Sequence, residues 1–175
     1  CSFEIPEFGD YAVGNVFLPR KANQRSFCES VFERHLNDQG LKLLGWRTLP
    51  VDPSVLGTIA KKTEPFVKQI FVSKPTQDQE DFEFNLKLYI ARKKTEHEIY
   101  NSKVSESNFF YLPSLSTKII IYKGLLIPED IKLYYKDLTN PLFVTRLALV
   151  HQRFSTNTFP TWDLAQPFRY MCHLS

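Results

Sequence analysis

The alternation of long amphipathic runs with β-rich runs is the feature that most constrains the fold of this chain. The first long run, residues 23–40, has apolar side chains at helical spacing and ends on Gly40, a residue typical of helix C-termini. We therefore predict a helix with an apolar face of Phe27, Val31, Phe32 and Leu36. Three β-rich runs predict strands at 11–19, 41–50 and 67–75.

The run from residue 81 to 103 carries two conflicting patterns. It begins with a strict alternation of apolar residues that is typical of a strand: Phe82, Phe84, Leu86, Leu88 and Ile90. The run is also long, rich in Glu, Lys and Arg, and free of Gly and Pro. We predict a helix, because length and composition outweigh the alternation.

The remaining runs predict shorter elements. Residues 107–124 would form two short strands with Ile119, Ile120 and Ile121 buried, and residues 128–138 a helix with a proline near its first turn. Residues 146–155 read as a core strand. Strands and helices in this mixed order predict an α+β protein.

Size and composition limit the domain count and the classes of partner. The chain has 175 residues, 43% of them hydrophobic, which supports one domain over residues 1–175 with a substantial core. Its net charge of +3 is mild and no basic run is interleaved with aromatic residues, which argues against nucleic-acid binding. No segment approaches the roughly 18–20 apolar residues that a membrane-spanning helix needs.

The cysteines predict neither a disulfide framework nor a metal site. There are three, at Cys1, Cys28 and Cys172, and none belongs to a CxxC pair. An odd number at wide spacing favours a reducing compartment. We therefore expect no metal ligands in this chain.

Short polar residues follow an arginine at the end of the predicted strand 146–155. Arg153 precedes Ser155 and Thr156, and a guanidinium beside hydroxyl groups suits the recognition of a carboxylate. The alternative is a structural arginine paired with a core acid beside a polar turn. His151 would share the strand face of Arg153 and would either support that pocket or pack in the core.

The final segment, HQRFSTNTFPTWDLAQPFRYMCH, resembles the signature of the glutamine amidotransferase domain of the glutamate synthases. Further segments resemble that family in the same order: YAVGNVFLP, GLKLLGWRTLPVD, IIYKGLL and YYKDL. The resemblance covers nearly the whole chain. It implies an N-terminal-nucleophile hydrolase, a four-layer α/β/β/α sandwich that is incomplete at both ends here, so that residues 1–175 would be one partial amidotransferase domain.

The resemblance also implies an activity. A cysteine at the mature amino terminus would attack the side-chain amide of glutamine, and the released ammonia would serve the reductive amination of 2-oxoglutarate to glutamate. FMN and an iron–sulfur cluster are expected in other domains of the full-length enzyme, and no cofactor in this chain. The implied partners are glutamine, the remaining synthase domains of the same polypeptide and a small reductase subunit, in the bacterial cytoplasm.

Four residues match the substrate pocket of the family. Arg153 matches the arginine that binds the glutamine α-carboxylate, and Thr156 a threonine of the same pocket. Phe154 and Ser155, between them, are expected to supply a pocket wall and backbone contacts. Trp162 and residues 166–168 match signature positions for which we expect packing roles.

The family nucleophile does not match Cys1. The family nucleophile opens a Cys-Gly-Val-Gly-Phe-type segment, whereas Cys1 is followed by Ser2, Phe3 and Glu4, so we expect the catalytic cysteine upstream of this sequence. Leu174 stands where the family has the asparagine of the oxyanion hole. The chain alone is therefore expected to be inactive, and to aggregate or fold only in part. The alternative function is a non-catalytic remnant that binds a glutamine-like amino acid or serves as an interaction module.

Overall fold

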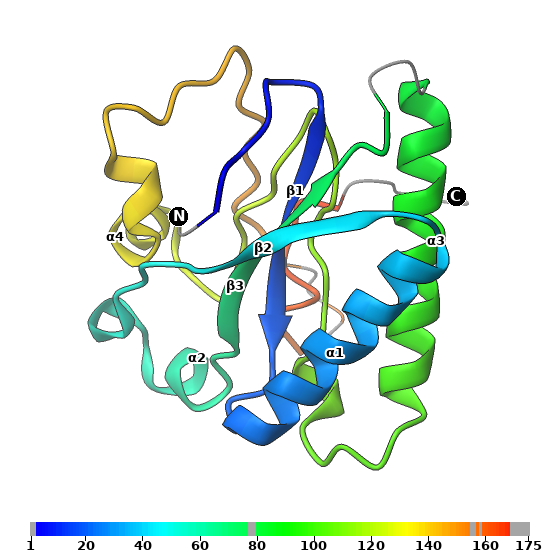
Figure 1. Cartoon of the computed structure of the whole chain (residues 1–175). Coiled ribbons are helices and arrows are strands. Elements are labelled where there is room, and N and C mark those ends of the chain that lie inside the picture. The colour runs from blue at the N-terminus through cyan, green and yellow to red at the C-terminus, as the bar shows by residue number, and fades with distance from the viewer. Residues whose placement is uncertain (1–2, 77–79, 155–156, 158, 169–175) are drawn as a thin grey trace. The chain divides into compact units, whose positions relative to one another are not determined.

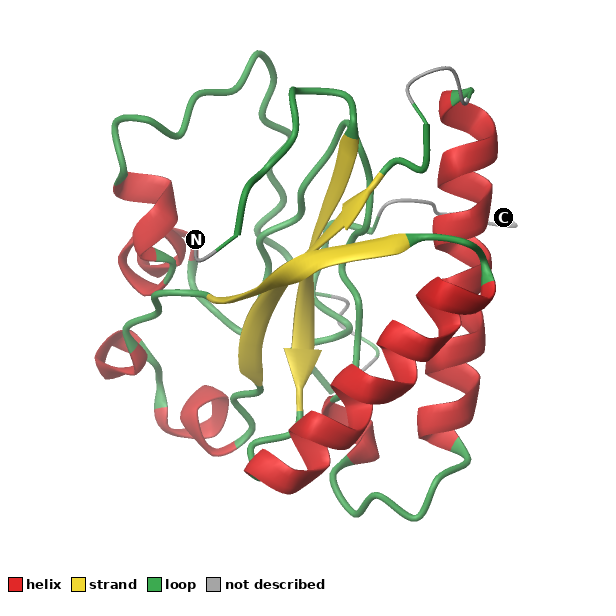
Figure 2. Cartoon of the chain, in the orientation of Figure 1, coloured by secondary structure: helices red, strands yellow, loops and turns green. Residues whose placement is uncertain are grey.

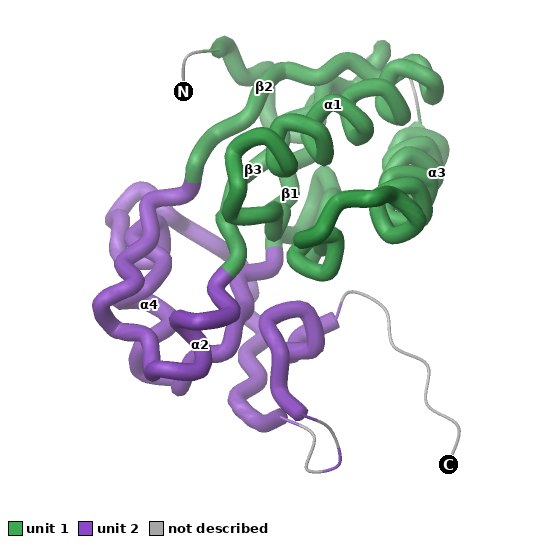
Figure 3. The backbone as a smooth tube through the Cα atoms, turned by 90° about the horizontal axis from the view of Figure 1, so that it is seen from below, with its two compact units in different colours: residues 1–48, 65–120 green, residues 49–64, 121–175 purple. Residues whose placement is uncertain are grey.

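The structure, a computed structural model of the chain, describes residues 3–76, 80–154, 157 and 159–168. The chain splits into two compact units (Figure 3). Unit 1 consists of residues 1–48 and 65–120, and unit 2 of residues 49–64 and 121–175.

Unit 1 contains an antiparallel sheet of three strands in the order β1-β3-β2 (Figure 1). The strands are β1 (Tyr11–Leu18), β2 (Lys42–Thr48) and β3 (Phe66–Ser73), as the β-rich runs predict. Ser73 of β3 lies opposite Tyr11 of β1 and Lys42 of β2, which fixes the register on both sides of the central strand.

Two helices cover one face of this sheet, α1 (Ala22–Asp38) and α3 (Asp81–Tyr100) (Figure 1). The two long predicted helices are confirmed. The alternation at the start of α3 has a simple explanation: Phe84 and Leu88, four residues apart, are buried in the core, whereas Phe82 and Leu86 are exposed. Gly40 follows α1 with φ +67°, a left-handed conformation that favours glycine at a helix end.

Residues 107–120 do not form the two predicted short strands. The structure has a 3₁₀ turn at Ser107–Phe109 and two isolated bridges to β1, Phe17 with Tyr111 and Val13 with Ser116. Pro113 lies between these bridges and has no N–H to donate, which prevents a continuous ladder. Of the three isoleucines expected to be buried, Ile121 is buried and Ile119 is exposed.

Unit 2 contains only short helical segments among its described residues (Figure 2). These are α2 (Thr58–Lys62), α4 (Ile131–Tyr134) and 3₁₀ turns at Pro53–Val55, Pro128–Asp130 and Lys136–Thr139. The predicted continuous helix at 128–138 is wrong. It breaks at Tyr135, which is extended and forms a bridge with Val51 that is flanked by the bonds Asp52 N–H to Tyr134 O and Lys136 N–H to Pro50 O.

The predicted core strand at 146–155 is also wrong over the part that the structure describes. Residues 146–153 have no regular secondary structure and no pairing partner among the described residues, and all of them are exposed. An apolar pattern makes a buried strand only where another strand is available to pair with it. The helices and the antiparallel sheet together confirm the α+β class.

Candidate functional site

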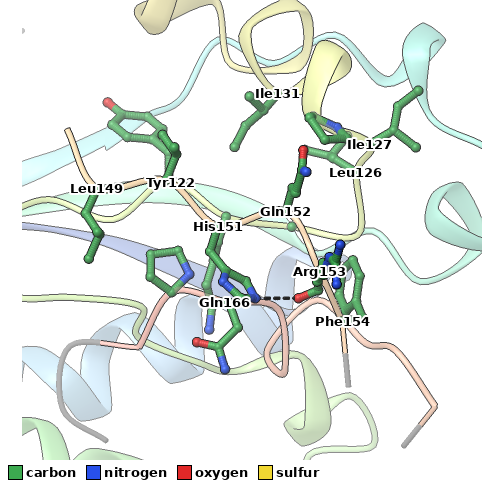
Figure 4. A pocket seen from close by; sticks show the side chains of 15 residues that line it. Tyr122, Leu126, Ile127, Ile131, Leu149, His151, Gln152, Arg153, Phe154 and Gln166 are labelled. Carbon is green, nitrogen blue, oxygen red and sulfur yellow. Dashed lines mark hydrogen bonds between the residues drawn. The ribbon is translucent and has the colours of Figure 1, made fainter. Parts of the chain in front are cut away.

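A pocket of about 670 Å³ lies within unit 2. Its lining residues come from three segments: 122–124, 126–128 and 131 in the first, 149–154 in the second, and 166–167 in the third. Figure 4 shows Leu126, Ile127 and Ile131 on the side of the pocket opposite Gln166. The volume is in the range of small-molecule sites, and the lining combines apolar side chains with a few polar groups, as such sites usually do.

Arg153 and His151 stand on the irregular segment 149–154, which lines the pocket. The Nε2–H of His151 donates to the main-chain carbonyl of Arg153 at 2.7 Å (Figure 4). This bond spans two residues and stiffens the exposed backbone that carries the guanidinium. His151 is exposed, which excludes the alternative that it packs in the core.

The charge of the pocket is positive. Arg153 and Lys123 both line it, and none of its described lining residues is Asp or Glu. Among the described residues, no hydrogen bond or ion pair is made by the guanidinium of Arg153. Its five donors thus have no partner within the part of the chain that the structure describes, and a carboxylate is the group that fits this fork best.

The structure brings together two of the four predicted substrate residues. Arg153 and Phe154 both line the pocket, and Phe154 is half-buried there. Ser155 and Thr156 lie outside the described residues, as do Cys1, Cys172 and His173. Cys28 belongs to unit 1, where it is fully buried in α1.

Trp162 is buried within unit 2, and its packing fits the role expected for it. The indole Nε1–H donates to the carbonyl of Ala60 at 3.1 Å. A Cβ on Gly124 would lie 2.6 Å from the Trp162 ring, so this close contact requires glycine.

Sequence reasoning missed Lys123, although IIYKGLL includes it. Its side chain is only 1% exposed, and its Nζ donates to the main-chain carbonyl of Asp163 at 2.6 Å. A lysine in an apolar run is unusual because ammonium groups are rarely buried. A lysine inside an apolar run was therefore the sequence signal that could have identified Lys123.

No helix among the described residues has the length and hydropathy of a membrane span. Nor do the described residues gather three or more His, Cys, Asp or Glu side chains into a group able to hold a metal. An iron–sulfur cluster requires several cysteine thiolates, and Cys28 is the single described cysteine. The described residues therefore do not fit such a cluster.

Comparison with curated proteins finds relatives along almost the whole chain. The glutamate synthase [NADPH] large chain of Bacillus subtilis is 43% identical over 98% of this chain, which covers 11% of that relative. The glutamate synthase [NADH] of Saccharomyces cerevisiae is 43% identical over 97% of this chain and 8% of its own length. The chloroplastic ferredoxin-dependent glutamate synthase of Oryza sativa is 42% identical over 92% of this chain and 10% of its own length.

The chain thus spans 8 to 11% of the length of these relatives. A family model for Glutamine amidotransferases class-II matches residues 1–174, which include all three strands and the three segments of the pocket. This chain belongs to the class-II glutamine amidotransferases.

Proposed function

We propose that the pocket of unit 2 binds L-glutamine and that Arg153 binds its α-carboxylate. The charge of the pocket is the main observation that supports this proposal: two cations line it, with no acid among the described lining residues. A bidentate Arg–carboxylate pair fixes both position and orientation of a small ligand. Phe154 supplies an apolar wall, and Ser155 and Thr156 would add hydrogen bonds to the same carboxylate.

In this proposal the chain binds and orients glutamine, and the nucleophile is a cysteine other than Cys28. The four-layer α/β/β/α sandwich of N-terminal-nucleophile hydrolases is part of the proposal. It would place a second sheet against the exposed segment 146–153. Holding the substrate amide in a fixed place accelerates attack because the reactants need not find each other in solution.

The relatives support a wider role. Glutamate synthases align with this chain at 42–43% identity over at least 92% of its length. We infer that it serves as part of such an enzyme, releasing ammonia from glutamine for the conversion of 2-oxoglutarate to glutamate. FMN, an iron–sulfur cluster and a small reductase subunit would belong to other parts of that assembly, in the bacterial cytoplasm. This similarity along almost the whole chain favours the enzyme over a non-catalytic remnant.

The test is substitution of Arg153 in the full-length product of the gene. Arg153→Met should raise the KM for glutamine roughly 30-fold, the equivalent of about 2 kcal/mol for a charged partner left unpaired. Arg153→Lys keeps the charge but loses the fork, so it should recover only part of the loss. Steady-state glutaminase assays measure both.

Arg146→Met is the matched control, because Arg146 is exposed on the same segment and does not line the pocket. It should leave the KM unchanged. Equal effects of the two methionine variants, or no effect of Arg153→Met, would contradict the role of Arg153.

A further inference from the structure

Lys123 is a buried cation with a defined environment. Its Nζ donates to the carbonyl of Asp163 at 2.6 Å and lies 4.4 Å from the ring centroid of Phe168. Taking an ammonium group out of water is costly unless such contacts compensate for it. Both partners belong to the segment 161–168, which follows Arg153 in the chain.

A second hydrogen bond fixes the main chain of Lys123. The hydroxyl of Tyr135 donates to the main-chain carbonyl of Lys123 at 2.8 Å. Burial raises the pKa of Tyr135 far above its ordinary value, so this hydroxyl stays protonated and remains a donor. Tyr135, Lys123 and Asp163 therefore form a chain of two hydrogen bonds through unit 2.

The neighbouring contacts act on the same segment. Trp162 packs against Gly124 and donates to the carbonyl of Ala60, and the N–H of Ala165 donates to Thr161 O at 3.2 Å. Gln166 and Pro167, one residue further on, line the pocket. The wall that these two residues form is thus held in place by Lys123, which itself lines the pocket, and by Trp162, which does not.

We propose that Lys123 is a positioning residue: it fixes segment 161–168 as one wall of the pocket, and so sets the affinity for glutamine. This inference rests on the proposed function for the identity of the ligand. It does not require Lys123 to touch the substrate. Its effect passes through the carbonyl of Asp163 and the ring of Phe168.

The experiment compares Lys123→Met with Lys123→Arg in the full-length product of the gene. Methionine keeps the apolar stem but loses the charge and the donor, whereas arginine retains both. Lys132→Met is the matched control, because Lys132 is an exposed residue of α4 in the same unit. Two kinds of measurement are made: hydrogen exchange of the amides of segment 161–168, including Ala165, and steady-state kinetics that give the KM and kcat of glutamine hydrolysis.

Lys123→Met should speed amide exchange in segment 161–168 and raise KM about tenfold with little change in kcat, as expected on loss of a hydrogen bond to a charged group. Lys123→Arg should restore most of both properties, and Lys132→Met should alter neither. Phe168→Leu removes only the ring beneath the ammonium and should shift both measurements in the same direction by less. It keeps the test decisive if Lys123→Met fails to fold.

Unchanged exchange in segment 161–168 for Lys123→Met and Phe168→Leu would overturn the positioning role. A melting temperature lowered without a change in exchange of this segment or in KM would also overturn it, since Lys123 would then be merely structural. If the unsubstituted protein does not hydrolyse glutamine, that result contradicts the proposed function instead. In that case the exchange measurement still decides whether Lys123 fixes the wall.

Discussion

Arg153 and Lys123 are two cations at one pocket in opposite environments. Arg153 is exposed, with its side-chain donors unused among the described residues, while Lys123 is buried and bonded to the main chain. The guanidinium of Arg153 can therefore bind an anionic ligand. The ammonium group of Lys123, which is already hydrogen-bonded, can instead hold the pocket wall in place. The sequence points to Arg153 because it stands among short polar residues. It does not single out Lys123, because burial depends on Tyr135 and Phe168, which are distant in the chain.

The surroundings of Cys28 suppress the reactivity of its thiol. Its side chain is fully buried in α1, and this burial raises the pKa of Cys28 to about 12. Only the thiolate is a good nucleophile. In the folded protein at pH 8, Cys28 should therefore resist alkylation by iodoacetamide, as measured by mass spectrometry of the peptide that contains it.

The same peptide alkylated in denaturant is the control, and there Cys28 should react fully. Rapid labelling of Cys28 in the folded protein would mean that α1 opens readily. It would also contradict a stable unit 1.

At the scale of elements, prediction succeeded where burial followed from a local pattern. Helix α3 places Phe84 and Leu88 on its buried side, a spacing visible in the sequence. It failed at Tyr135, where pairing with Val51 overrides the helical pattern. It failed again at residues 146–153, because a strand also needs a neighbour. In both segments the secondary structure depends on pairing with residues far along the chain. A local sequence pattern carries no information about such partners.

Helices α1 and α3 are joined by charged groups at their surface. Glu98 of α3 accepts hydrogen bonds from Arg34 and His35 of α1. The bond from Arg34 is the main cause that holds the pKa of Glu98 below its ordinary value of 4.5. A carboxylate with a lowered folded pKa stabilises the protein at pH above the unfolded value, and this contribution is lost as the pH falls through the folded value.

Glu98→Gln should therefore lower the free energy of unfolding at pH 7 and have a smaller effect at pH 3 and below. The side chain of Glu98 is 39% exposed, so solvent limits the difference to under about 1 kcal/mol. Urea unfolding at the two pH values measures it. A loss that is equal at both would show that the charge of Glu98 is not responsible.

At the scale of the whole molecule, one exposed apolar segment dominates the expected solution behaviour. Residues 142–150 expose five large aliphatic side chains by more than 80% each: Leu142, Val144, Leu147, Leu149 and Val150. An unpaired segment with exposed apolar side chains can associate with another copy of itself. We expect the isolated chain to self-associate as its concentration rises.

Val144→Lys combined with Leu147→Lys should reduce this association, because lysine on an unpaired segment opposes edge-to-edge pairing. Sedimentation velocity over a range of concentrations measures it. Thr58→Lys with Thr139→Lys adds the same charge at exposed positions outside the segment. If this control reduces association equally, net charge is the cause and the apolar segment is not.

The bonds that hold the pocket wall also bear on how this sequence can diverge. The side chain of Tyr135 donates to the main-chain carbonyl of Lys123, and the side chain of Lys123 donates to the main-chain carbonyl of Asp163. Each bond thus needs a specific donor side chain, but its acceptor is a main-chain group. Every amino acid has that carbonyl. Evolutionary drift is therefore restricted at the two donor positions, whereas the bond from Lys123 places no requirement on the side chain at position 163.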